Sequence, residues 1–142
     1  MTNYIFLNDN IIPDTDGSVS TEDRGFLYGD GIYETLRSYN GNPFKLSEHL
    51  ERMRYSAKQL RISFEYTNAE IDKWINELIE KNRCQDAYIR ITLSRGAGGG
   101  RLQMDDNIDP TTMIQVKALT PYDRNLYDEG MSLVVSDYRR ST

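Results

Sequence analysis

Two segments of the sequence, 31–39 and 87–95, alternate apolar residues with tyrosine, threonine and arginine. A period of two predicts extended strands with one apolar and one polar face. The polar positions are Tyr33, Thr35, Arg37 and Tyr39 in the first segment and Tyr88, Arg90 and Thr92 in the second. A guanidinium group binds a carboxylate or a phosphate through its planar fork, and phenols can line the rest of such a site. The two polar faces therefore form either a solvated sheet surface or, as the phenols favour, the wall of an anion pocket.

A third candidate region follows, where Leu50, Met53 and Ala57 recur at helical spacing. Next to this stripe runs a polar row, which consists of His49, Arg52, Ser56 and Gln59. His49 is the single histidine of the chain, and no serine or cysteine nucleophile motif accompanies it. From the residues alone, His49 and Arg52 are therefore ordinary polar positions of an amphipathic helix.

The segment 96–100 is rich in glycine and is flanked by Arg95 and Arg101. It has no Gly-Lys-Ser/Thr ending, so it is not a P-loop, and it lacks the spacing of a dinucleotide-binding loop. Two interpretations stay open for it, a flexible hairpin connection and a lip over a site that the two arginines could reach. Cys84 is the single cysteine, which excludes an internal disulfide framework and a multi-cysteine metal site. No metal is expected.

The elements that would position these residues follow one another as strands, two helices and strands again. The second helix begins at Thr67, whose capping box with Glu70 precedes a regular apolar stripe. Asn40-Gly41 predicts a tight hairpin turn after the first polar strand. Strands are predicted at 4–7, 11–12, 31–39, 43–46, 87–95, 113–119 and 131–136, helices from 47 and from 67, and a loop at 13–30. This order predicts an α+β fold, in which an antiparallel sheet is packed with two helices on one face.

Length and composition bound the class of protein. A chain of 142 residues is long enough for one domain with its own core. Hydrophobic residues make up 38% and charged residues 27%, which is a globular balance. The net charge of −5 argues against a nucleic-acid binder, and no apolar stretch approaches the ~20 residues of a membrane span. The first residues lack the features of a signal peptide, so we expect a cytoplasmic protein without nucleic-acid or membrane partners.

Four stretches of the sequence, taken in order, resemble the N-terminal domain of the class IV aminotransferases, which are pyridoxal-phosphate enzymes of fold type IV. The stretches are 23–37 (DRGFLYGDGIYETLR), 44–53 (FKLSEHLERM), 88–90 with 94–96 (YIR and SRG) and 134–140 (VVSDYRR). The resemblance covers nearly the whole chain. The family includes branched-chain aminotransferases, D-amino-acid aminotransferases and aminodeoxychorismate lyase.

The resemblance implies roles for the residues at matching positions. Arg52 would bind the phosphate of the cofactor, pyridoxal 5′-phosphate. The residues expected on the substrate side of the cofactor are Tyr28, Tyr33, Thr35, Arg37, Tyr88 and Arg90. Those on the two strands also belong to the polar faces that the alternation singles out, so the pocket interpretation gains support. The substrates would be an amino acid and a 2-oxo acid, and the active form would be a homodimer.

The resemblance also implies that the family's catalytic lysine lies beyond Thr142, at the start of a second domain. The lysines present match neither that lysine nor its surroundings; they are Lys45, Lys58, Lys73, Lys81 and Lys117. Residues 1–142 are therefore expected to form the N-terminal small domain of the enzyme, without a catalytic residue of their own and inactive alone.

Three readings of the activity stay open. The first is an aminotransferase of branched-chain or related amino acids, toward which the Tyr88-Ile89-Arg90 stretch leans. The second is aminodeoxychorismate lyase, which eliminates pyruvate on the same scaffold; the glycine-rich segment leans toward this or a D-amino-acid enzyme. The third is a non-catalytic binding module that retains the fold.

Overall fold

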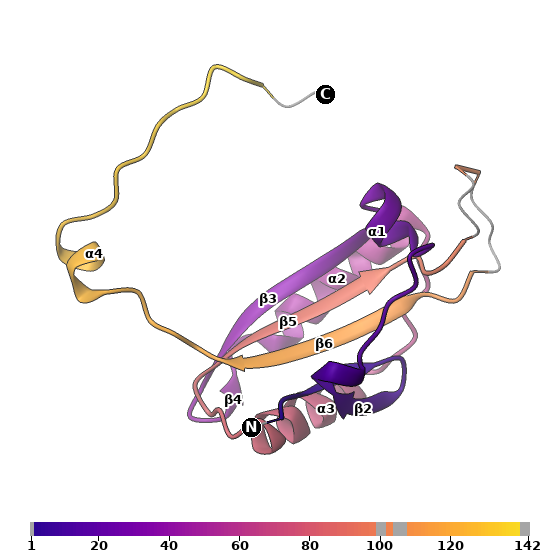
Figure 1. The fold of residues 1–142 in the computed structure, drawn as a ribbon, viewed down its shortest axis with the longest axis horizontal. Helices are drawn as coiled ribbons and strands as arrows, with labels where there is room; N and C mark the ends of the chain where they lie inside the picture. The colour runs from indigo at the N-terminus through magenta and orange to yellow at the C-terminus, as the bar shows by residue number, and fades with distance from the viewer. Residues whose placement is uncertain (1, 99–101, 104–107, 140–142) are drawn as a thin grey trace.

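Six strands form one sheet in the computed structural model, which describes residues 2–98, 102–103 and 108–139. The strand order is β2-β1-β6-β5-β3-β4, and every neighbouring pair is antiparallel (Figure 1). The strands are β1 (Tyr4–Leu7), β2 (Asn10–Pro13), β3 (Gly31–Tyr39), β4 (Asn42–Pro43), β5 (Ala87–Ser94) and β6 (Thr111–Ala118). The helices are η1 (Asp14–Asp16), α1 (Arg24–Tyr28), α2 (Leu46–Leu60), α3 (Asn68–Lys81) and α4 (Arg124–Asp128). The predicted α+β class is confirmed.

Helices α2 and α3 pack on the same face of the sheet and close the core (Figure 1). Helix α3 begins at its predicted capping box, in which the Thr67 hydroxyl accepts from the Glu70 amide and the Glu70 carboxylate accepts from the Thr67 amide. The predicted stripes are buried at Leu50, Met53 and Ala57 in α2 and at Ile71, Ile75, Leu78 and Ile79 in α3. The remaining stripe residue, Trp74, stacks on Phe6 of β1 with the ring centroids 4.1 Å apart. The other face of the sheet stays open along β3, β5 and β6.

The segment 13–30, predicted as a loop, contains the short helix α1 directly before β3. The carboxylate of Asp23 caps the helix by accepting from the Gly25 amide at 2.7 Å. Gly29 ends it at a φ of +67°, a conformation that glycine adopts without steric cost. Five residues are too few to show a helical period, which is why the sequence pattern misses this helix.

The predicted strand at 131–136 is wrong. After β6 the described chain leaves the sheet, forms α4 and continues without regular structure to residue 139 (Figure 1). Leu133, Val134 and Val135 are 83%, 95% and 94% exposed. These residues favour a strand, but a strand forms only when a neighbour pairs with it, and no described residue pairs with this segment.

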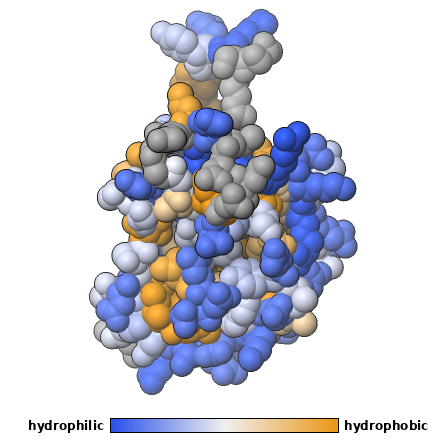
Figure 2. Space-filling view, turned by 90° about the vertical axis from the view of Figure 1, so that its right-hand side faces the viewer, coloured by the Kyte–Doolittle hydropathy of each residue, from blue (hydrophilic) through white to orange (hydrophobic). Residues whose placement is uncertain are grey.

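The surface seen from the right-hand side of Figure 1 is mainly hydrophilic, with apolar residues in separate patches (Figure 2). Within the ranges that the structure describes, no helix has both the length and the apolar character needed to cross a membrane.

Candidate active site

The open face of the sheet gathers the polar residues of β3 and β5 into one surface. The register of the two strands pairs Tyr33 with Thr92, Thr35 with Arg90, and Arg37 with Tyr88. Residues directly opposite in an antiparallel pair lie on the same side of the sheet. The alternating residues between them, such as Leu36 and Ile89, are buried against the helices. The composition of this face therefore agrees with the prediction from alternation.

Two arginines on the open face lie against tyrosine rings. The guanidinium carbon of Arg90 is 3.8 Å from the ring centroid of Tyr33, and that of Arg37 is 4.4 Å from the ring centroid of Tyr39. The Nε of Arg90 also donates to the Thr92 hydroxyl at 3.4 Å. Among the described residues neither arginine forms a salt bridge, and the Nε of Arg37 is buried without a hydrogen-bond partner. Rings hold both cations while leaving guanidinium donors available for an anion.

Tyr88 lies in the middle of this cationic surface. The pKa of its phenol is lowered, first by a hydrogen bond with Thr35, then by one with Arg90, against the opposing effect of burial. The charge of Lys117, which β6 places opposite Tyr88, acts in the same direction. The structure thus brings together Thr35, Tyr88 and Arg90, which the sequence predicted, and adds Lys117, which it did not. A cationic face on a chain of net charge −5 attracts an anionic ligand.

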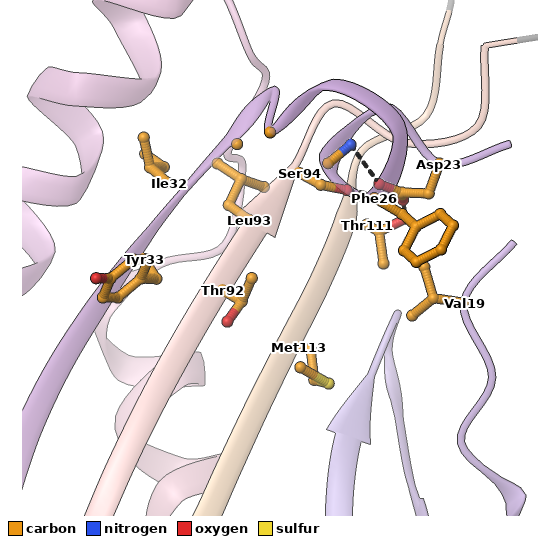
Figure 3. Close-up of a pocket in the computed structure, with 13 residues that line it drawn as sticks. Val19, Asp23, Phe26, Ile32, Tyr33, Thr92, Leu93, Ser94, Thr111 and Met113 are labelled. Atoms are coloured by element: carbon orange, nitrogen blue, oxygen red, sulfur yellow. Dashed lines mark hydrogen bonds between the residues drawn. The ribbon is translucent and has the colours of Figure 1, made fainter. Parts of the chain in front are cut away.

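An apolar cavity of about 360 Å³ lies at the start of β3, next to the polar face. Figure 3 shows Tyr33, Thr92 and Met113 on three neighbouring strands, with Val19 and Phe26 across the cavity from them. A cavity of this size and lining suits an apolar group of a small molecule.

Tyr28, also predicted as a substrate residue, does not lie on a strand. It ends α1 between two residues that line the apolar cavity, Phe26 and Gly29, and is 42% exposed. The guanidinium carbon of Arg24 lies 5.1 Å from the centroid of its ring. The structure therefore places Tyr28 beyond the end of the strand face, at the cavity-lining turn.

Arg52, the predicted phosphate ligand, lies on α2 and reaches Glu34 of β3. Its Nε donates to one oxygen of Glu34 at 2.7 Å, and its Nη2 donates to the other. The Nδ1 of His49 lies 2.8 Å from the same carboxylate. Burial alone would raise the pKa of Glu34, but the hydrogen bonds from Arg52 and His49 outweigh burial, and the pKa lies below its usual range. The same pairing raises the pKa of Arg52.

The Arg52 cluster borders a second cavity of about 310 Å³, which is lined by Arg52, Met53, Ser56 and the first four residues of β3. The Glu34 side chain is 7% exposed, whereas that of Arg52 is 64% exposed. Tyr33 lines both cavities. This is possible because β4 covers only the last two residues of β3, Ser38 and Tyr39, and leaves the remaining edge of β3 open.

A buried ion cluster before β3 was not predicted. Asp30 accepts from the Nε of Arg24 at 2.9 Å and from the Nε and Nη2 of Arg95 at 2.7 and 3.0 Å. The hydrogen bond from Arg95 is the main cause that lowers the pKa of Asp30. Arg95 also donates to the carbonyls of Leu60 and Arg61 at the end of α2. The expectation that Arg95 reaches a ligand is therefore wrong, because its donors are used within the fold.

The rest of the glycine-rich segment limits what can be said of the predicted lip. Gly96 and Gly98 are described, and Gly96 has a φ of +93°. Gly99, Gly100 and Arg101 lie outside the described residues. In the described ranges no cluster of histidine, cysteine, aspartate and glutamate has the arrangement of a metal site.

Comparison with known proteins now decides the family. The sequence pattern of the amino-transferase class IV family matches residues 31–142. The chain belongs to this family. The resemblance seen in the four sequence stretches is therefore confirmed, and class IV aminotransferases supply the frame for the site described above.

Three curated relatives from the family carry different names. A Methanocaldococcus jannaschii protein named "Putative branched-chain-amino-acid aminotransferase" is 42% identical over 96% of this chain and 46% of its own length. The aminodeoxychorismate lyase of Bacillus subtilis is 34% identical over 97% of this chain and 47% of its length. A D-alanine aminotransferase of Staphylococcus epidermidis is 38% identical over 66% of this chain and 33% of its length. The chain thus spans about half the length, or less, of these relatives.

Solved class IV structures share the fold. The branched-chain aminotransferase of Escherichia coli superposes with a TM-score of 0.78 at 25% identity, over 86% of this chain and 41% of that one. A second branched-chain aminotransferase, whose source is abbreviated T.th., contains pyridoxamine 5′-phosphate. It gives a TM-score of 0.73 at 26% identity, again over 86% and 41%.

Two carboxylates of the family stretch at 23–37 were missed as site-building residues. Asp23 is buried and accepts from the hydroxyls of Ser94 and Thr111, both at 2.8 Å. Glu34 anchors Arg52. Glu34 had a usable signal, since a carboxylate on the apolar face of a strand requires a cationic partner. Asp23 had none, because Thr111 is 88 residues away in the chain.

Proposed function

We propose that this chain supplies the N-terminal domain of a pyridoxal 5′-phosphate-dependent aminotransferase, which transfers an amino group between an amino acid and a 2-oxo acid. The observation that carries the proposal is the continuity of the site around the open edge of β3. The cationic, phenol-lined face and the cavity beside Arg52 meet at Tyr33. A phosphate ester at Arg52 would therefore lie next to a surface that can bind a substrate carboxylate.

The residues beside the second cavity fit the phosphate of the cofactor. Arg52 presents an exposed guanidinium, and Ser56 adds a hydroxyl. Arginine binds phosphate oxygens through paired N–H groups. When bound, pyridoxal 5′-phosphate supplies the electron-accepting ring on which amino-group transfer depends. The solved relative that contains pyridoxamine 5′-phosphate supports this assignment.

The open face would bind and orient the substrate. Arg37 and Arg90 bind its carboxylate, because among the described residues neither is neutralised by an acidic side chain. Tyr88, hydrogen-bonded with Thr35, contributes a phenol to the same group. Tyr33 separates the carboxylate side from the phosphate side, and Tyr28 closes the far end of the cavity. The apolar cavity beside Tyr33 and Met113 accepts an aliphatic side chain, which favours branched-chain or related amino acids.

The lysine that carries the cofactor would lie in a second domain outside residues 1–142, so this domain forms one wall of the site. The working form would be a homodimer. The relatives' lengths support the two-domain arrangement, because this chain matches about half of them or less.

Aminodeoxychorismate lyase is the second candidate, favoured by the 34% identity with the Bacillus subtilis lyase over 97% of this chain. One experiment separates the two. The full-length protein is incubated with pyridoxal 5′-phosphate and assayed both for amino transfer from a panel of L- and D-amino acids to 2-oxo acids and for pyruvate release from aminodeoxychorismate. Transfer from aliphatic L-amino acids without pyruvate release supports the aminotransferase. Pyruvate release alone supports the lyase, and neither activity contradicts the proposal.

A further inference from the structure

The carboxylate of Glu34 is buried on the helix-covered face of β3, two residues from Leu36 on the same side of the strand. A carboxylate in such a place destabilises the fold unless cationic and hydrogen-bonding groups compensate it. We propose that Glu34 is a positioning residue, which fixes the guanidinium of Arg52 so that its unused edge binds the phosphomonoester of the cofactor. The inference rests on the proposed function, in which Arg52 is the phosphate ligand.

The donor pattern of Arg52 divides its guanidinium into two edges. A guanidinium has five N–H donors in a fixed plane. Glu34 takes the edge formed by Nε and Nη2. Within the part of the chain that the structure describes, Nη1 has no hydrogen-bond partner. The edge formed by Nη1 and the second Nη2 hydrogen is therefore available for two oxygens of a phosphate.

The exposure of the pair explains why a positioning residue is needed. The Arg52 side chain is 64% exposed, and a solvated arginine samples many rotamers that binding must freeze. Glu34 is 7% exposed on a central part of β3 and cannot follow such motion. Two parallel hydrogen bonds to a fixed carboxylate therefore select one guanidinium orientation before the phosphate arrives.

His49 holds the carboxylate from the other side. Its Nδ1 lies 2.8 Å from the Glu34 oxygen that also accepts from the Nη2 of Arg52. His49 and Arg52 are one helical turn apart on α2, so the helix and the strand are joined through a single carboxylate. The imidazole restrains Glu34, which in turn restrains Arg52.

Charge alone predicts the opposite consequence, which makes the inference testable. A carboxylate beside an anion site repels the anion, so its removal should tighten phosphate binding. If Glu34 acts by orienting Arg52, its removal should weaken phosphate binding instead. Glu34→Gln is the sharpest substitution, because the amide keeps the shape but presents one donor face to a guanidinium that can only donate.

The experiment measures equilibrium dissociation constants of pyridoxal 5′-phosphate and of pyridoxal, which lacks the phosphate, in the full-length protein. The variants are Arg52→Ala, Glu34→Gln and the double variant, and Glu51→Gln is the control, since it removes an exposed carboxylate next to Arg52 in sequence. Arg52→Ala should weaken pyridoxal 5′-phosphate by about ten- to a hundredfold and leave pyridoxal unchanged. Glu34→Gln should weaken it by about five- to thirtyfold, again without an effect on pyridoxal. The double variant should equal Arg52→Ala, because Glu34 acts only through that side chain.

The outcomes separate the inference from the function on which it rests. If Arg52→Ala leaves pyridoxal 5′-phosphate binding unchanged, the phosphate role of Arg52 is wrong. If Arg52→Ala weakens binding but Glu34→Gln does not, or tightens it, the positioning role is wrong and the phosphate role stands. Additive losses in the double variant, or equal losses for pyridoxal, also overturn the positioning role. Should Glu34→Gln fail to fold, Glu34→Asp replaces it, because the shorter carboxylate keeps its charge but pulls the guanidinium out of register.

Discussion

Asp30 and Glu34 lie four residues apart around the start of β3, and each binds arginine through both carboxylate oxygens. The two clusters differ in the exposure of the cation. The side chains of Arg24 and Arg95 are 6% and 9% exposed, whereas that of Arg52 is 64% exposed. The carboxylates therefore do not distinguish an ion pair that holds the fold from one that serves a ligand; the exposed donors of the cation do.

The use of the donors follows this difference. Arg95 spends its Nε and Nη2 on Asp30 and its Nη1 and Nη2 on two carbonyls at the end of α2, so it joins the turn before β3 to the helix. Arg52 spends one edge on Glu34 and faces a cavity with the rest. A buried guanidinium with every edge bound is a structural tie, and one with a free edge at a cavity is a binding group.

The largest effect expected from this comparison is on stability. Arg95→Met removes the main partner of Asp30 and leaves two helix carbonyls without their donor. Breaking one side of a buried ion pair should lower the free energy of unfolding by about 3 kcal/mol. Chemical denaturation measures the loss. Arg52→Met, on an exposed cation, should change unfolding far less.

Equal losses of stability in the Arg95 and Arg52 variants would contradict the distinction between the two clusters. The distinction would also fail if Arg95→Met lowered cofactor affinity while leaving the unfolding midpoint untouched.

The second effect concerns the open face, whose cations Arg37 and Arg90 have no acidic partner among the described residues. Arg90→Leu and Arg37→Leu should each lower kcat/KM by about 2–4 kcal/mol in the full-length enzyme, as expected when one side of a charged contact is truncated. Cofactor affinity should stay unchanged. Steady-state kinetics against an amino-acid series checks this, with Arg124→Leu in the exposed helix α4 as a control. Loss of cofactor with normal turnover at saturation would move these arginines to the phosphate side.

The open face and the helix-covered core could be predicted because local period fixes them. Tyr33, Thr35 and Arg37 share a face simply because strands alternate, and Thr67 with Glu70 marks a helix start without any tertiary information. The residue roles that the family resemblance implies stay predictions.

The ion clusters could not be predicted, because each joins residues far apart in the sequence. Asp30 and Arg95 are 65 positions apart, and Glu34 and Arg52 are 18 apart. The strand predicted at 131–136 failed for the same reason. The Leu-Val-Val run has the local preference for a strand, but a partner strand decides whether one forms.

A third prediction tests the clusters by pH. The folded-state pKa values of Asp30 and Glu34 are both lowered, so each carboxylate binds its proton less readily in the folded state than in the unfolded state. Their stabilisation is therefore complete above the unfolded values near pH 4 and is lost as the pH falls through the folded values. Asp30→Asn should flatten this acid loss more than Glu34→Gln, because water screens the exposed Arg52. Unfolding curves between pH 2 and about 7 measure it, with Asp72→Asn on α3 as a control; a steeper acid loss in Asp30→Asn would contradict the buried cluster.

The smallest effect is expected from a polypeptide of residues 1–142 alone, which should show neither amino transfer nor pyruvate release. The chemistry needs a neutral amine placed beside the reacting carbon, and the lysines of this chain are poorly placed for it. Lys45 caps α2, and Lys58, Lys73 and Lys81 lie on the helices. Lys117 is on the open face beside Tyr88, but β6 is two strands from β3, about 10 Å away at the usual strand spacing.

Pyridoxal 5′-phosphate should therefore form only slow adducts spread over several lysines of this polypeptide, with Lys117 the most reactive because its neighbours Arg90 and Tyr88 attract the phosphate. Borohydride reduction followed by peptide mass spectrometry measures their distribution, and Lys117→Arg should remove the largest share without changing the rest. A stoichiometric adduct on one lysine that an amino acid discharges would falsify the assignment of the catalytic amine to a second domain. It would also show that the open face, rather than the Arg52 cavity, receives the phosphate, which would reverse the roles given to the two regions.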